Sequence, residues 1–289
     1  MTKLKVKTDR RFTWDEYLNR VESRLKADHS KCWGRSSTSD RDEEWAGTKD
    51  LPSAIALARN GWPEGAARIQ QNIEHAADGD LPSLFPARDY DLGGEYPDVT
   101  AYCAGQPDYM VSHGEANTGI SPVVRLGING GANCSLSAEA LSRFGAAVLS
   151  HAAAFQRAGY SVALDWLKLG SDGMAAGKTK GLHLTRVEIL TAGAVLDVDR
   201  VAFMLAHPAM LRRFWFADIE MVDRAKGMQF EYGFSKPVSA APAGWYEGIA
   251  LPKIEEFPGN EHEASTEDFA KWLGEFLDRA LHGEQQQAA

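Results

Sequence analysis

Apolar residues recur at helical spacing in several parts of the chain, and sequence signals mark where these parts begin. The capping-box pattern Thr13-Trp-Asp-Glu16 predicts a helix over about 14–26. A long apolar-rich segment predicts a second helix over 136–157, and Thr266 is expected to cap a final amphipathic helix. Helical patterning is therefore present near both ends of the chain and in its middle.

Strand patterns occupy the middle of the chain as well. Alternating or β-branched runs predict strands over 123–128, 160–169 and 182–190, and the last two are expected to pair as a hairpin with a long tip. A short polar loop over 129–135 joins the first of these strands to the long helix. The predicted order of elements in the middle of the chain is therefore strand, loop, helix and hairpin.

Weaker signals fill the remaining segments. The predicted helices are 51–60, 63–77 and a helix that Asp197 caps and that ends at about Ala206; the predicted strands are 216–221 and 228–234. The stretch 78–122 is rich in Gly, Pro, Asp and Tyr, so we expect irregular structure with short strands there.

This order of elements indicates an α/β fold with a Rossmann-like sheet, flanking helices and a helical N-terminal extension. We expect the extension to cover 1–78, an irregular connecting segment 79–122, the α/β domain 123–283 and a disordered tail 284–289.

Composition agrees with a folded domain of this kind. The 289 residues are 44% apolar and 25% charged, which excludes an intrinsically disordered chain. The net charge of −9 disfavours a protein whose main role is to coat nucleic acid. The basic residues Lys3, Lys5, Lys7, Arg10 and Arg11 nevertheless form a basic arm, so nucleic-acid binding stays open beside a solvated N terminus.

The sequence predicts a cytoplasmic protein that does not enter membranes. The N terminus lacks the apolar core of a secretory signal, and the longest apolar stretch is too short to span a bilayer. Cys32, Cys103 and Cys134 are few and far apart, which favours reduced thiols.

The strand over 123–128, the loop Asn129-Gly-Gly131-Ala-Asn133-Cys-Ser135, the long helix and the hairpin together resemble the opening of von Willebrand factor A-like domains. In that family the loop reads Asp-x-Ser-x-Ser and binds a metal, and an antiparallel hairpin lies at the edge of a mostly parallel sheet. The resemblance places Asn129, Gly131 and Asn133 at the Asp and Ser positions.

Without a carboxylate such a loop attracts a hard cation weakly. We therefore expect no cofactor, with a weakly bound divalent metal at Asn129, Asn133 and Ser135 as the open alternative.

Four distinctive strings make the whole chain resemble an uncharacterised family encoded by bacteriophages and prophages. The strings are Trp45-Ala-Gly-Thr48, Gly61-Trp-Pro-Glu-Gly65, Asp98-Val-Thr-Ala-Tyr-Cys-Ala-Gly105 and His207-Pro-Ala-Met-Leu-Arg-Arg213. This resemblance implies a phage origin, action in the host cytoplasm and no defined activity.

Motifs for catalysis are weak. The segment 172–179 misses the P-loop pattern by one position and precedes a strand, whereas a P-loop must open a helix. The chain has no Gly-x-Ser-x-Gly elbow, and its histidines lack the spacing of metal ligands. Cys134 near a helix N terminus is more simply a small buried thiol than a nucleophile.

The pattern therefore favours a non-enzymatic interaction protein that binds a protein partner. We expect the binding residues at the carboxyl end of the first strand of the α/β domain, where ligands of open α/β sheets bind, and in an aromatic loop nearer the N terminus. The candidate residues are Asn129, Gly131, Asn133, Ser135, Trp33, Arg35 and Trp45.

Two alternatives remain at this stage. One is an enzyme or nucleotide-binding protein that uses the same crevice, which charged side chains such as Asp165, Lys168 or Glu188 near the loop would support. The other is a nucleic-acid-binding accessory protein that uses the basic arm.

Overall fold

The computed structural model describes residues 5–26, 43–67, 69–70, 89–91, 96–97, 102, 109–112, 122–132, 135–172, 181–220, 230–235 and 241–287. Its helical elements are α1 (Trp14–Ser23), η1 (Arg24–Lys26), α2 (Glu43–Ala46), α3 (Leu51–Asn60), α6 (Ala138–Arg157), α7 (Val198–Ala206), the π-helical η4 (Met210–Phe214), α8 (Trp215–Glu220), η7 (Ile254–Glu256) and α9 (Thr266–Gln287). Its strands are β1 (Lys5–Thr13), β2 (Asp89–Asp91), β3 (Tyr96–Pro97), β4 (Met110–Ser112), β5 (Val123–Asn129), β6 (Ser161–Asp172), β7 (Gly181–Leu190), β8 (Phe230–Ser235) and β9 (Ile249–Ala250).

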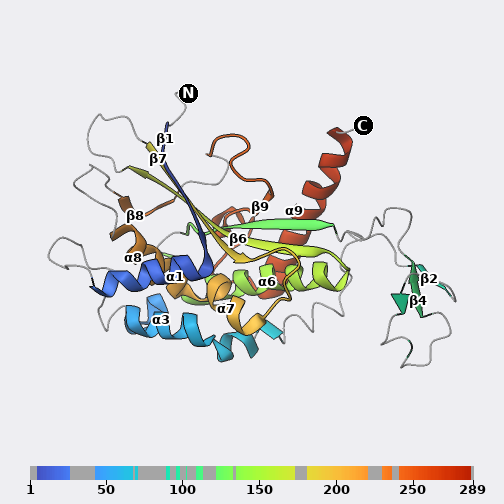
Figure 1. Ribbon diagram of the computed structural model, residues 1–289, viewed down its shortest axis with the longest axis horizontal. Coiled ribbons are helices and arrows are strands. Elements are labelled where there is room, and N and C mark those ends of the chain that lie inside the picture. Colours follow the sequence, from blue (N-terminus) through green and yellow to red (C-terminus); the bar gives the residue numbers. More distant parts are fainter. Residues whose placement is uncertain are drawn as a thin grey trace.

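The protein has an α/β fold built on a mixed sheet (Figure 1). Within the described residues, its strands follow the order β1-β7-β6-β5-β9, and β8 pairs with the end of β6. Strand β5 runs parallel to β6 and β9, β1 runs parallel to β7, and β6 and β7 form the predicted antiparallel hairpin. Strands β2, β4 and β3 form a separate small sheet, in the stretch where short strands were expected.

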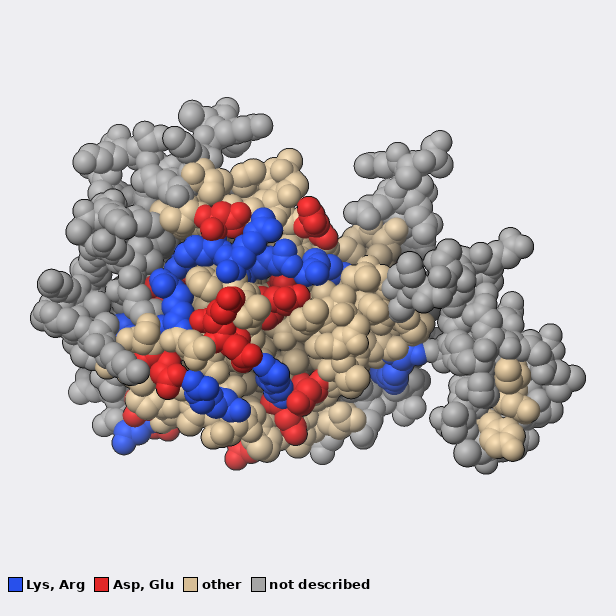
Figure 2. Space-filling view, viewed as in Figure 1, with Lys and Arg blue, Asp and Glu red and all other residues tan. Residues whose placement is uncertain are grey.

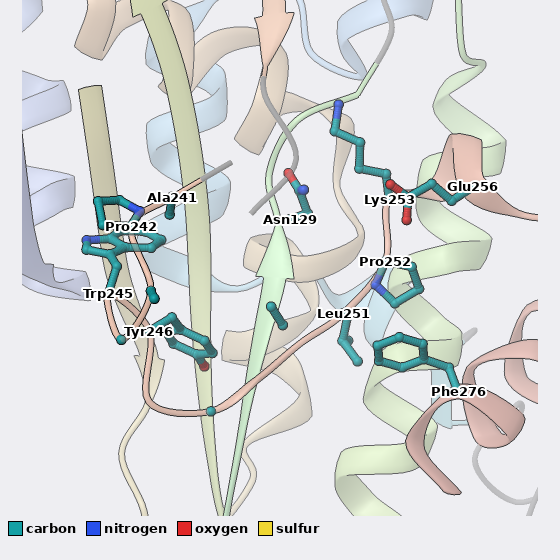
Figure 3. A pocket seen from close by; sticks show the side chains of 14 residues that line it. Asn129, Ala241, Pro242, Trp245, Tyr246, Leu251, Pro252, Lys253, Glu256 and Phe276 are labelled. Carbon is teal, nitrogen blue, oxygen red and sulfur yellow. The ribbon is translucent and has the colours of Figure 1, made fainter. Parts of the chain in front are cut away.

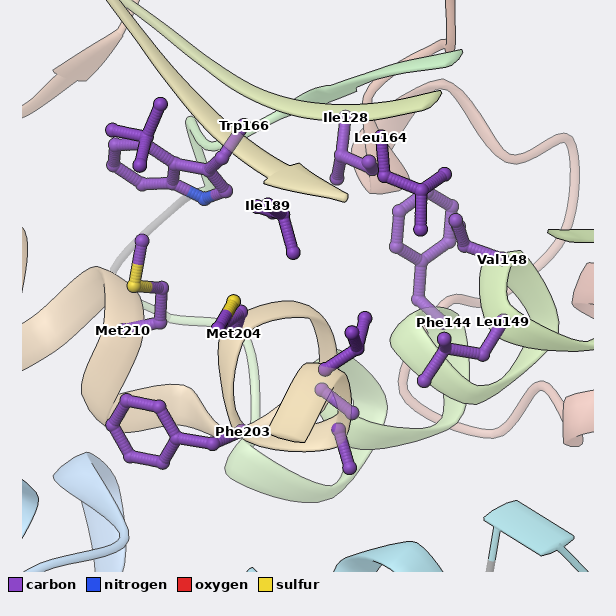
Figure 4. Close-up of a cluster of buried hydrophobic side chains, with 14 of the residues drawn as sticks. Ile128, Phe144, Val148, Leu149, Leu164, Trp166, Ile189, Phe203, Met204 and Met210 are labelled. Carbon is purple, nitrogen blue, oxygen red and sulfur yellow. The ribbon is translucent and has the colours of Figure 1, made fainter. Parts of the chain in front are cut away.

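Alternation along β6 assigns its side chains to two faces. Leu164 and Trp166 join the main hydrophobic core, which the helices α1, α6, α7 and α8 cover (Figures 1 and 4). Leu169 points to the other face and belongs to a small cluster with Leu182 and Trp245. Residues 241–246 therefore pack against the face of the sheet opposite the helices, whereas Leu251 and Ile254 join the main core.

The N-terminal segment differs from the expected basic arm. Residues 5–13 form β1, paired with β7 along most of its length. Arg10 donates to both carboxylate oxygens of buried Asp218, at 2.9 and 2.6 Å, so its charge is paired inside the fold with a carboxylate that Arg20 shares. Because Arg10 is engaged in this way, it adds no free positive charge at the N terminus.

Basic side chains gather elsewhere on the surface. A band of Lys and Arg side chains crosses the face seen in Figure 2, above the strands of the main sheet, with Asp and Glu side chains on both sides of it. The net negative charge is therefore unevenly distributed over this face.

The predicted strand over 216–221 is wrong, because α8 covers Trp215–Glu220. Phe214, Trp215 and Phe216 are all buried, and a continuous run of buried apolar residues has the same pattern in a strand as in a buried helix. The strand predicted over 228–234 is confirmed as β8.

The caps of three helices follow from side chains near their first turns. Thr13 and Glu16 form the predicted capping box of α1, and Asp197 caps α7 as expected. The cap of α9 is Ser265 rather than Thr266: its hydroxyl accepts from the backbone N–H of Asp268, whose carboxylate accepts from the N–H of Ser265. Only Ser265 has an acid three residues later, which decides between the two candidates.

Candidate functional site

The loop that follows β5 is held tightly against the sheet. Its first backbone N–H, that of Gly130, donates to the carbonyl of Leu167 at 2.7 Å, and the amide oxygen of Asn129 accepts from the N–H of Gly131 at 3.1 Å. A Cβ at Gly130 would lie 2.2 Å from the ring of Trp166. Close contact with that ring therefore requires glycine here.

Two buried cations bind this loop at its two ends. The amine of Lys168 donates to the carbonyl of Gly130 at 3.1 Å, and Arg212 donates to the carbonyl of Leu136 at 2.5 Å. Lys168 lies 5.0 Å from the ring centre of Trp215, and the guanidinium of Arg212 lies 4.4 Å from that of Trp45. Aromatic faces thus replace part of the hydration that both cations lose on burial.

Burial lowers the pKa of Lys168 from 10.5 to about 7. The charge of Lys253 contributes to this decrease, and that of Glu255 opposes it. A lysine amine that changes its charge near neutral pH thus lies beneath the loop.

A pocket opens beside Asn129, at the carboxyl end of β5 (Figure 3). Its volume is about 420 Å³, within the range of ~300–1,000 Å³ of ligand pockets. We call it the strand-end pocket. Its lining residues are Asn129, Ala241, Pro242, Ala243, Gly244, Trp245, Tyr246, Gly248, Ala250, Leu251, Pro252, Lys253, Glu256 and Phe276.

The strand-end pocket is formed by residues of the segment 241–256, by Asn129 of β5 and by Phe276 of α9. Figure 3 shows Trp245 and Tyr246 on one side and Pro252 and Phe276 on the other. Phe276 belongs to α9, whereas Trp245 and Tyr246 precede β9. The pocket therefore combines apolar and polar surface, and it exists only in the folded chain.

A buried ionic network fixes the Tyr246 side. The carboxylate of Asp165 accepts from the Tyr246 hydroxyl at 3.1 Å, from Arg125 at 2.8 Å and from Arg186 at 3.0 Å. Burial and the charge of Asp165 raise the pKa of Tyr246, so its hydroxyl stays a neutral donor. A Cβ at Gly127 would lie 2.7 Å from the tyrosine ring. The ring is thus held in place before any ligand arrives.

The structure brings some of the predicted site residues together. Asn129 and Gly131 begin the loop and exposed Ser135 lies near its end, while Trp33, Arg35 and Asn133 lie outside the described residues. Trp45 is half-buried, and its ring faces Arg212 and the ring of Phe216. Trp45, expected in a loop, thus lies in the short helix α2 with its ring partly covered.

Arg212 explains why Trp45 lies beside the loop. The same guanidinium donates to the backbone carbonyls of Trp45 and Leu136, residues far apart in sequence. Arg213 donates to the carbonyls of Thr48 and Lys49 at 2.9 and 3.2 Å. The pair therefore attaches the segment 45–49 to the core.

The residues that sequence reasoning missed are Trp245, Tyr246, Lys253 and Phe276. One signal was available, since Trp245 and Tyr246 follow a Pro-Ala-Gly turn and aromatic residues outside regular elements favour binding sites. Nothing in the sequence indicates that Phe276 would lie opposite them.

Of the charged residues that would support an enzyme, Asp165 and Glu188 are register partners across β6 and β7, and Lys168 lies apart from Asp165. Lys168 reaches the loop, whereas Asp165 is on the opposite face of β6 with three hydrogen-bond donors around it. Among the described residues, no three His, Cys, Asp or Glu side chains are grouped so as to hold a metal ion. The two cations beneath the loop repel a metal ion electrostatically.

No helix in the described ranges is both long enough and apolar enough to cross a membrane.

The free energy of unfolding is expected to rise with pH because of Lys168. Its folded-state pKa of about 7 is below the ordinary 10.5, so between these values the unfolded state binds more protons. Burial of the charged amine therefore destabilises the fold below pH 7, and this penalty falls as pH rises to about 10. Urea denaturation of wild type, K168M and the exposed-site control K271M across this range measures the effect.

The stability of wild type relative to K168M should increase with pH, and that relative to K271M should stay constant. If K168M does not fold, the ¹³Cε shift of Lys168 in wild type provides the same information. An amine that titrates at its ordinary value would contradict the burial of Lys168.

The comparisons identify the family but no relative of known activity. The family described as "Domain of unknown function (DUF7192)" matches residues 12–275, so the chain belongs to this family. No curated protein and no solved structure matches the chain.

Proposed function

We propose that the protein is a non-enzymatic binding protein that takes an extended segment of a protein partner into the strand-end pocket. The observation that carries this proposal is the pocket itself, at the carboxyl end of β5, with aromatic and proline side chains on both sides and Asn129, Lys253 and Glu256 at one end. Aromatic side chains are the residue type that most often anchors a partner at an interface.

Rigidity of the pocket supports binding with little rearrangement. Tyr246 is fixed by Asp165, and the indole N–H of Trp245 donates to Asp9 at 3.2 Å. The loop at the Asn129 end is held by Lys168 through Gly130. A site whose walls are already ordered loses less conformational entropy when it binds.

The proposal extends to the type of fold. A von Willebrand A-like sheet is supported by parallel β5 and β6, by the helix α6 between them and by antiparallel β7 beside β6. On that assignment, the loop after β5 occupies the position of the family's metal-binding loop. If the chain is phage-encoded, as the sequence resemblance implies, its partner would be a host protein.

Binding is favoured over the enzyme alternative by the position of Lys168. The chemically unusual group near the site is this amine, but it is 2% exposed and is not part of the pocket lining. Lys168 therefore acts on the pocket through the loop rather than on a bound molecule.

The test is selection of peptides from a random displayed library on the full chain. Affinities of the selected peptides are then measured by fluorescence anisotropy for wild type, A243W and A194W. Ala243 is an exposed residue that lines the strand-end pocket, and Ala194 is an exposed loop residue outside it. We expect A243W to fill the pocket and weaken binding at least about tenfold, a change of ~1.4 kcal/mol, with A194W unchanged.

Failure to select any peptide, or equal affinities for A243W and wild type, would contradict the proposal. Thermal-shift measurements with nucleotides and with short oligonucleotides cover the two alternatives. A shift with nucleotides that A243W abolishes would favour a nucleotide-binding protein.

A further inference from the structure

The positive and negative charges around the strand-end pocket differ in how deeply they are buried. Lys253 lines the pocket, and Lys168 and Arg212 lie beneath the adjoining loop with 2% and 1% of their surfaces exposed. The acidic neighbours are Glu255, which is half-buried, and Glu256, which is exposed and lines the pocket. The cations are thus mostly buried, and one of the two carboxylates is solvated.

Buried charges act more strongly on a ligand than exposed ones, because little water screens them. Lys168 and Lys253 are close enough for the charge of one to disfavour that of the other. Glu255 offsets part of this repulsion, and on the β7 side the register partner of Lys168 is the uncharged Thr185. Beyond Thr185, Arg10 is paired with Asp218, whose carboxylate also pairs with Arg20.

Two polar groups at one end of the pocket also favour a negatively charged ligand. The side-chain oxygen of Asn129 is occupied by the N–H of Gly131, so its amide NH₂ is the end that can donate to a ligand. Figure 3 shows Asn129 and Lys253 at the same end, with Glu256 beside Lys253. An amide donor and an ammonium together match a carboxylate.

We infer that the partner segment held by the strand-end pocket is an acidic peptide, whose Asp or Glu carboxylate lies between Asn129 and Lys253 while neighbouring apolar residues contact Trp245, Tyr246 and Phe276. This inference rests on the proposed function and adds the chemistry of the partner. A carboxylate at that end would relieve the repulsion between Lys253 and Lys168 and would compete with Glu256 for Lys253.

The first test uses the selected peptides and their neutral counterparts. Each Asp or Glu in a selected peptide is replaced by Asn or Gln, and both forms are titrated against wild type, K253Q and the exposed-site control K271Q. For one acidic position of the peptide, we expect the replacement to weaken binding at least about tenfold with wild type and K271Q. With K253Q, the same replacement should weaken binding less than about threefold. Such a coupling between the peptide carboxylate and Lys253 identifies the pair directly.

A second variant is expected to change the affinity for acidic peptides in the opposite direction. E256Q removes the carboxylate that competes for Lys253, so it should bind the acidic peptides more tightly than wild type and the neutral ones equally. Peptides that bind the pocket without any acidic preference would overturn this inference and leave the proposed function intact.

A second probe separates the two proposals if no peptide is selected. Glutarate and its neutral analogue glutaramide are titrated into the ¹⁵N-labelled full chain. Shifts at Asn129 and Gly131 that follow glutarate alone, and that K253Q abolishes, would retain a carboxylate site while the peptide proposal fails. Equal responses to both compounds, or no response to either, would overturn the acidic preference. Stronger shifts with inorganic phosphate than with glutarate would also overturn it, in favour of a phosphate-bearing ligand.

Discussion

Replacing Asp218 with alanine is expected to lower the free energy of unfolding by about 3 kcal/mol. Its carboxylate is fully buried and is paired with Arg10 of β1, at 2.6 Å, and with Arg20 of α1, at 2.5 Å. Without it, two guanidinium groups are left beside the core with no counter-charge. The value is at the low end for a broken buried pair because Arg10 and Arg20 keep some contact with solvent.

Urea denaturation measures this change, and D199A is the matched control. Asp199 is an exposed residue in the first turn of α7, so its loss should cost no more than about 0.5 kcal/mol. Equal stabilities of D218A and D199A would mean that Asp218 does not hold β1 and α1 to α8.

Replacing Gly145 with alanine is expected to destabilise the protein by about 2–3 kcal/mol, although alanine is the better helix former. A Cβ at this position in α6 would lie 2.3 Å from the carbonyl oxygen of Leu205 and 2.5 Å from Cα of Ala206. Both atoms belong to the backbone of α7, so no side-chain rotation can relieve the contact. The two helices would have to separate within the main core.

Thermal and urea unfolding of G145A give the change directly. A variant as stable as wild type would mean that α6 and α7 do not approach as closely as the structure has them. Hydrogen exchange of α7 amides provides a local readout, because protection should fall there first.

Local sequence signals were enough to predict elements whose stability is mostly local. The capping box at Thr13 and Glu16, the Asp197 cap and the hairpin of β6 and β7 all follow from residues near one another. The α/β class followed from the order of those elements. In the segment Trp215–Glu220, periodicity could not distinguish a strand from a buried helix.

Strand β1 could not be predicted because its pairing is entirely long-range. The run Lys5–Thr13 is polar and basic, and only its position beside β7 and the pairing of Arg10 with Asp218 make it a strand. Removal of residues 1–11 would delete most of this strand. Such a truncation therefore cannot test nucleic-acid binding by a basic arm.

The candidate site was predicted in part. The Asn129 end follows from the rule that ligands bind at the carboxyl ends of strands. The two walls, with Trp245 on one side and Phe276 on the other, depend on how the segments after β8 fold back on the sheet. The two cations beneath the loop likewise require knowledge of α8 and α2, since Lys168 and Arg212 lie against the rings of Trp215 and Trp45.

The most direct measurement of the central claim is a crystal structure of the full chain with a selected peptide. We predict that the peptide lies between Trp245 and Phe276, with an Asp or Glu carboxylate within hydrogen-bond distance of Asn129 and Lys253. A peptide bound on another face, with the strand-end pocket unoccupied, would contradict the account.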